Sequence, residues 1–155
     1  MKFNPALALG LIAFSLATPS VMAEDDHKNH KEAGHEAHAD HMLEGYAALS
    51  TALYKDDLAA AQKAATGMVK HDKDSAMAKH AQAIADSKTI EDARKHFKEL
   101  SDIAIPIAKK EGGMHVAHCP MAMEGKGADW LQKSDEEIQN PYFGAKMAHC
   151  GKFTK

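Results

Sequence analysis

Residues 89–113 read TIEDARKHFKELSDIAIPIAKKEGG, and this stretch decides the fold. Its apolar side chains recur every three or four residues, which is the period of an amphipathic helix; they are Ile90, Ala93, Phe97, Leu100, Ala104 and Ile107. Thr89 and Asp92 resemble a capping box, and Gly112 and Gly113 end the pattern. The stretch therefore predicts one long helix that buries a single face.

Three shorter stretches before this helix repeat the same pattern. Apolar residues at helical spacing cover about 42–53, 58–68 and 77–84, and Asp57 is the predicted N-cap of the second helix. Short loops between helices of this length favour antiparallel neighbours. The predicted fold class is therefore all-α, a small up-and-down bundle of three to four helices. Because the stripes are rich in Ala, we expect a thin core.

The composition excludes some classes of protein. The chain has 155 residues, with 19 Lys and Arg against 22 Asp and Glu, which gives a net charge of -3. It has no excess of positive charge for phosphates, so we expect no nucleic-acid binding. The 2 Cys cannot form a disulfide-dense scaffold. The 11 His and 9 Met stand out, because both side chains bind soft or borderline metals.

The N-terminus has the pattern of a secretory signal peptide. Lys2 precedes an apolar run at 6–17, and small residues at 21–23 suit cleavage after Ala23. The run is shorter than the roughly 20 residues of a membrane-spanning helix, so we expect no stable membrane insertion after cleavage. Residues 1–23 are therefore predicted to direct export, for example to the periplasm, where a disulfide can form.

Residues 24–41 contain no Leu, Ile, Val, Phe, Tyr or Trp, so they are predicted to form a disordered, His-rich arm. The histidines of this segment are His27, His30, His35, His38 and His41. On a flexible segment they could chelate Cu(II), Zn²⁺ or Ni²⁺. The alternative is a solvated tail without a metal.

The helical-bundle domain is assigned to 42–155, including a C-terminal cap at 114–155 that holds both Cys, the only Trp and four of the ten Gly. This composition predicts a loop-rich cap. The spacing of Ser134 and Glu137 predicts one short helix in it, through Ile138. Trp130 is predicted to be part of the core.

The tripeptide Ala-His-Cys occurs twice, at 117–119 and 148–150, with Met and His around each Cys. Thiolate and thioether ligands select Cu(I) or Ag(I). We therefore expect a soft-metal site for Cu(I), with Ag(I) as a chemical mimic. The first choice of ligands is Cys119, Met121, Met147 and Cys150. The second choice is His118, His149, Met123, Met114 and His115.

A structural disulfide between Cys119 and Cys150 is the competing interpretation. It would stabilise the fold by roughly 3 to 4 kcal/mol on the chain-entropy estimate. The neighbouring Met would then only fill gaps in the core. The disulfide and the metal site could also be two redox states of one site.

Five segments resemble an uncharacterised bacterial domain family: ARKHFKELS at 93–101, HCPMA at 118–122, GADWL at 127–131, IQNPYFG at 138–144 and KMAHCG at 146–151. The family occurs as small exported proteins and appended to Cus-type copper/silver efflux adaptors. The resemblance spans about 42–155 and implies a helical bundle with a role in heavy-metal handling. It also implies a metal-efflux adaptor or another envelope protein as partner. The matching motif positions are Cys119, Pro120, Met121, Asp129, Trp130, Asn140, Pro141, Tyr142, Phe143, Gly144, Met147 and Cys150.

The sequence contains no nucleophile elbow, no His-Glu-x-x-His, no glycine-rich phosphate loop and no Cys-x-x-Cys pair, so we do not expect an enzyme. His71, His80 and His96 fall on predicted helices and are interpreted as surface or partly buried residues. The expected function is metal capture or transfer, and the alternative is a disulfide-stabilised interaction module that docks on an efflux or envelope protein.

Overall fold

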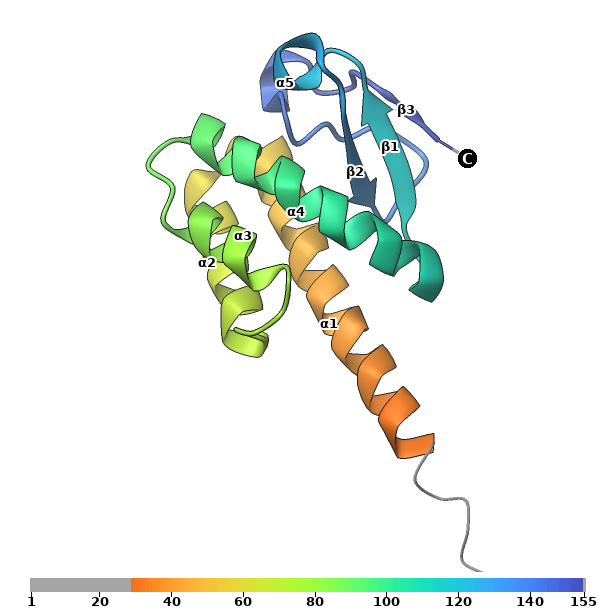
Figure 1. Ribbon diagram of the computed structural model, residues 1–155. Coiled ribbons are helices and arrows are strands. Elements are labelled where there is room, and N and C mark those ends of the chain that lie inside the picture. Colours follow the sequence, from red (N-terminus) through yellow and green to blue (C-terminus); the bar gives the residue numbers. More distant parts are fainter. Residues whose placement is uncertain (1–28, 155) are drawn as a thin grey trace, which may run out of the picture.

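The computed structural model describes residues 29–154, with side chains from 38 to 154. The elements are α1 (Asn29–Tyr54), α2 (Leu58–His71), α3 (Ala78–Ala85), α4 (Ile90–Glu111), β1 (His115–Cys119), α5 (Ala122–Gly125), β2 (Ala128–Gln132), η1 (Gly144–Lys146) and β3 (Lys152–Phe153). Helices α1 to α4 pack together, and the sheet lies against α4 and α1 (Figure 1). The predicted signal peptide lies outside the described residues.

The predicted starts of α2 and α4 are confirmed by their capping contacts. The Asp57 carboxylate accepts a hydrogen bond from the Ala60 N–H at 2.9 Å, at the start of α2. The Thr89 hydroxyl accepts one from the Asp92 N–H at 3.1 Å, at the start of α4. Gly112 ends α4 with a φ of 83°, a conformation that favours glycine. These local signals predicted the start of α2 and both ends of α4 correctly.

The core is thin, as expected from the Ala-rich stripes. Several of its helix positions are fully buried alanines, namely Ala61, Ala65, Ala81, Ala93 and Ala104. Large aromatic side chains supply much of the remaining core. Tyr46 of α1, for example, stacks on Phe97 of α4 with ring centroids 5.0 Å apart. Trp130 is fully buried, which confirms its predicted place in the core.

The prediction of an all-α fold is wrong in the cap, and the protein is mainly rather than purely α. The cap contains a three-stranded antiparallel sheet in the order β2-β1-β3. Burial in β1 reaches every second residue, Ala117 and Cys119, which is the period of a strand. The strands are short and β1 carries His, Ala and Cys, so their local β-propensity is weak.

The short helix predicted from Ser134 to Ile138 is also absent. The side-chain amide of Gln132 donates to the Ser134 and Glu137 carbonyl oxygens at 2.6 and 2.7 Å. A side chain from β2 therefore binds carbonyl groups that a helix would have used.

Helix α1 covers residues 29–41, for which the composition predicts a disordered arm, so the structure differs from that prediction. His38 Nε2 lies 2.7 Å from Asp72 Oδ2, and the His38 ring stacks on His71 with centroids 4.8 Å apart. These contacts dock this part of α1 on the end of α2. Among residues 29–154, no helix has the length and apolar character needed to cross a membrane.

Candidate functional site

The two cysteines meet where β1 ends and β3 begins. The antiparallel register pairs Ala117 with Phe153 and His118 with Lys152, so the chain that enters β3 runs beside the end of β1. This brings Cys150 next to Cys119, close enough for the Cys119 thiol to raise the pKa of Cys150. Both are free thiols; Cys119 is buried and Cys150 is half-buried. The fold thus places the two Ala-His-Cys segments side by side, with their cysteines as neighbours.

The neighbourhood favours the protonated thiol of Cys150. The neighbouring Cys119 side chain is the largest cause that raises the pKa of Cys150, and burial and the charge of Cys119 act in the same direction. The backbone N–H of Met121 lowers this pKa in part. An incoming metal ion would therefore have to displace a proton when it binds.

Asn140 holds the loop that carries Cys150. Its side-chain amide donates to the Cys150 carbonyl at 2.7 Å, and its backbone N–H donates to the Ala148 carbonyl at 2.9 Å. Its side-chain oxygen accepts from the Tyr142 N–H at 2.8 Å, and the residue is fully buried. Asn140 therefore fixes the path of the chain into the cysteine pair, a positioning role that sequence reasoning did not assign.

Gly151 lets the two segments approach closely. Its φ is 139°, and a Cβ at this position would lie 2.8 Å from the His118 carbonyl oxygen and 2.9 Å from Cη2 of Trp130. No other residue type fits both that backbone conformation and that space. The contact between the thiols depends on a glycine directly after Cys150.

The four methionines proposed as ligands differ in where their backbone lies: two of them have backbone groups beside Cys150, and the other two do not. Met121 is 57% exposed, and its backbone N–H reaches Cys150. Met147 lies in the same turn as Cys150, whose N–H donates to the Met147 carbonyl at 3.1 Å. Met114 precedes the opposite end of β1, and Met123 lines a separate cavity.

The predicted histidine ligands do not gather at the thiols. Side chains alternate along a strand, so His118 and Cys119 project from opposite faces of β1. His118 Nδ1 lies 2.6 Å from Asp129 Oδ1, across from it on β2. His115 is at the far end of β1, and His149 Nδ1 lies 2.9 Å from the Ile138 carbonyl. These three side chains are used in other contacts.

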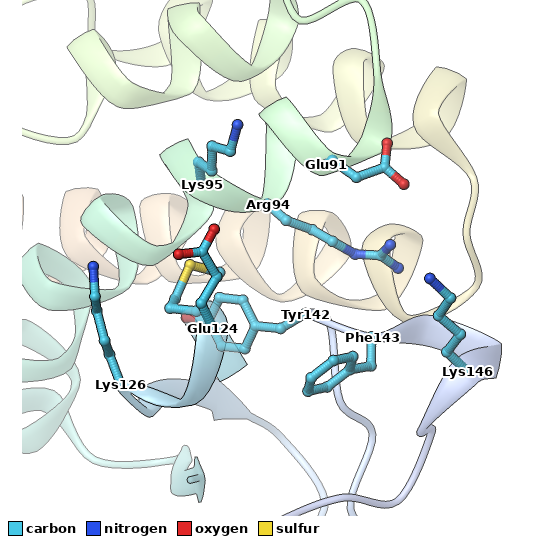
Figure 2. Close-up of a pocket in the computed structure, with 9 residues that line it drawn as sticks. Glu91, Arg94, Lys95, Glu124, Lys126, Tyr142, Phe143 and Lys146 are labelled. Carbon is cyan, nitrogen blue, oxygen red and sulfur yellow. The ribbon is translucent and has the colours of Figure 1, made fainter. Parts of the chain in front are cut away.

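A cavity of about 420 Å³ opens between α4 and the cap. Figure 2 shows Arg94 and Lys95 on the α4 side and Tyr142, Phe143 and Lys146 on the cap side. Arg94 is buried, and its guanidinium donates to the carbonyl groups of Leu53 and Pro141 at 2.9 and 2.7 Å. The Arg94 side chain therefore connects α4 to the end of α1 and to the cap.

The helical part of the chain matches one protein family. Residues 42–114 match a family described as "Protein of unknown function (DUF3347)". The match ends before Cys119, so the cysteine pair and the C-terminal motifs lie outside it. No curated protein and no solved structure matches this chain.

Proposed function

We propose that the protein is an exported Cu(I)-binding protein that captures the ion or transfers it to an efflux system, with Ag(I) as a mimic. The observation that carries the proposal is the contact between the Cys119 and Cys150 thiols. Two thiols in contact, with two methionines in the adjoining turns, offer the soft donors that monovalent copper and silver prefer.

The exposure of the donors supports transfer rather than permanent storage. Cys119 is buried, Cys150 is half-buried and Met121 is largely exposed, so the exposure of the soft donors increases from the interior to the surface. An ion on such a site can pass to a partner through the exposed donor before it leaves the buried one. Export and a partner in metal efflux rest on the N-terminal pattern and on the family resemblance of the C-terminal motifs.

The test is an anaerobic titration of the reduced protein with Cu(I) against a chromophoric Cu(I) chelator. We expect C119S/C150S to lose the tight site. Met121→Leu and Met147→Leu should each weaken binding by about 10-fold or more, as changes around metal sites commonly do. Met114→Leu is the matched control, because Met114 lies at the other end of β1, and it should bind Cu(I) as the wild type does. Equal binding by wild type and C119S/C150S would refute the proposal.

The same thiol contact favours a second function, in which Cys119 and Cys150 form a permanent disulfide and the domain docks on a metal-efflux or other envelope protein. Counting free thiols on protein isolated from its native compartment separates the two functions. A full disulfide together with no Cu(I) uptake supports docking, whereas free thiols that are lost on Cu(I) addition support metal binding.

A further inference from the structure

Three side chains that the soft-metal site does not use converge between α3 and α4. They are His80 on α3 and His96 and Glu99 on α4, and Figure 1 shows these two helices side by side. His80 Nδ1 lies 2.9 Å from Glu99 Oε2, and His96 Nδ1 lies 3.6 Å from the same oxygen. All three potential ligand atoms fall within 4.8 Å of one another.

The helices hold these groups in place. His96 and Glu99 are three residues apart, so they share one face of α4. His80 is 21% exposed, which makes it the most buried member, whereas His96 and Glu99 are 42% and 56% exposed. The cluster therefore has one restrained imidazole at its base and two side chains that can adjust at the surface.

The donor set differs from that of the cysteine pair. Two imidazoles and one carboxylate suit a divalent borderline ion, and three protein ligands leave a coordination position for water or another ligand. Ligands bonded at about 2.0–2.2 Å to a tetrahedral ion lie about 3.4 Å apart. The ligand atoms lie within 4.8 Å of one another, so reaching that value needs a movement of at most about 1.4 Å, which rotation of the exposed His96 side chain can supply.

The lysines next to His96 and Glu99 on α4 pair with other carboxylates than Glu99. Lys98 Nζ lies 2.5 Å from Asp102, and Lys95 Nζ lies 3.3 Å from Asp92. The two lysines of α4 that flank His96 and Glu99 thus each have a carboxylate of their own. The Glu99 carboxylate faces only the two imidazoles among the ion pairs of residues 38–154.

We propose that His80, His96 and Glu99 form a second metal site, which binds a divalent first-row ion such as Zn²⁺ and is independent of the cysteine pair. The protein would then hold a soft monovalent ion in its cap and a borderline divalent ion on its helices.

The test uses full-length protein with Cys119→Ser and Cys150→Ser, so that thiolates do not take the added Zn²⁺. Imidazole ¹H–¹⁵N NMR signals are followed during a Zn²⁺ titration, which separates these histidines from those near the N-terminus. We expect the His80 and His96 signals to shift together. Glu99→Gln should raise the Zn²⁺ concentration needed for these shifts by about 10-fold or more.

Glu137→Gln is the matched control, since Glu137 lies 3.4 Å from the single imidazole of His149. It should leave the response of His80 and His96 unchanged, and far-UV circular dichroism checks that each variant is folded. The proposal is overturned if the His80 and His96 signals stay at their metal-free positions during the titration. It is also overturned if Glu99→Gln responds as its parent does. Because the cysteines are absent from this experiment, its result does not depend on the proposed Cu(I) site.

Discussion

Arg94 Nη2 lies 2.6 Å from Asp56 Oδ1, and this ion pair joins three parts of the fold. Arg94 belongs to α4, and Asp56 lies in the turn between α1 and α2. The other oxygen of Asp56 accepts a hydrogen bond from the Ala145 N–H of the cap at 2.8 Å. One carboxylate therefore ties the bundle to the loop that leads to Cys150.

The first prediction concerns this carboxylate and acid stability. The Ala145 N–H is the largest cause that lowers the pKa of Asp56 below its ordinary 3.8, and Arg94 adds to it. Because the folded pKa is depressed, its contribution is complete above pH 3.8 and is lost as the pH falls through the folded value. We expect Asp56→Asn to cost about 1 kcal/mol near neutral pH, since the side chain is 41% exposed.

Urea unfolding at several pH values measures this effect. Asn tolerates the positive φ of 57° at this position, so the variant tests the charge more than the backbone. Asp57→Asn is the control, because Asn is an equally good N-cap. The difference between wild type and Asp56→Asn should shrink on acidification, and a constant difference down to about pH 2 would contradict the assignment.

The second prediction concerns the hydroxyl of Tyr46, which connects α1 to the sheet. It accepts from the Leu131 N–H at 3.1 Å and lies 2.6 Å from Ser101 Oγ. Tyr46→Phe would leave a buried N–H without a partner, so we expect a loss of about 1–3 kcal/mol in the free energy of unfolding. Tyr54→Phe, at a half-buried tyrosine, should change it by less than about 0.5 kcal/mol. Equal effects of the two changes in urea unfolding would argue against the role of Tyr46.

The third prediction compares two glycines. Gly151→Ala places a Cβ against His118 and Trp130 at a φ of 139°, so it should destabilise the protein by about 1–3 kcal/mol. It should also slow disulfide formation between Cys119 and Cys150, because the two segments are pushed apart. Gly67 lies in α2, and a Cβ at this position would have nothing within 4 Å. Gly67→Ala should therefore stabilise the protein by about 0.5–1 kcal/mol. Thermal unfolding and thiol counting after mild oxidation measure both effects, and unchanged oxidation in Gly151→Ala would contradict the close approach.

The sequence predicted the helices well, because their signals are local. Thr89, Asp57 and Gly112 act within one turn of the chain, and the apolar stripe of α4 repeats every three or four residues. The sheet was missed because its strands are short and gain their stability from pairing partners that are distant in sequence, such as His118 and Lys152.

The candidate site was only partly predictable for the same reason. The repeated Ala-His-Cys tripeptide pointed to Cys119 and Cys150, but the alternation of β1 that turns His118 away from Cys119 required a strand assignment. The convergence of His80 with Glu99 depends on how α3 packs on α4, which no local pattern encodes.

The last prediction concerns oxidation of the cysteine pair. Because the thiols are already in contact, mild oxidation should join Cys119 and Cys150 within one molecule with little rearrangement of the fold. The chain-entropy estimate gives a gain of roughly 3–4 kcal/mol in the free energy of unfolding over the reduced protein. Urea unfolding of both forms measures it, and C119S/C150S should show no difference between oxidising and reducing buffers. Cu(I) added before the oxidant should block the reaction if both sulfur atoms hold the ion. Intermolecular dimers as the main product, or a less stable oxidised form, would contradict the thiol geometry.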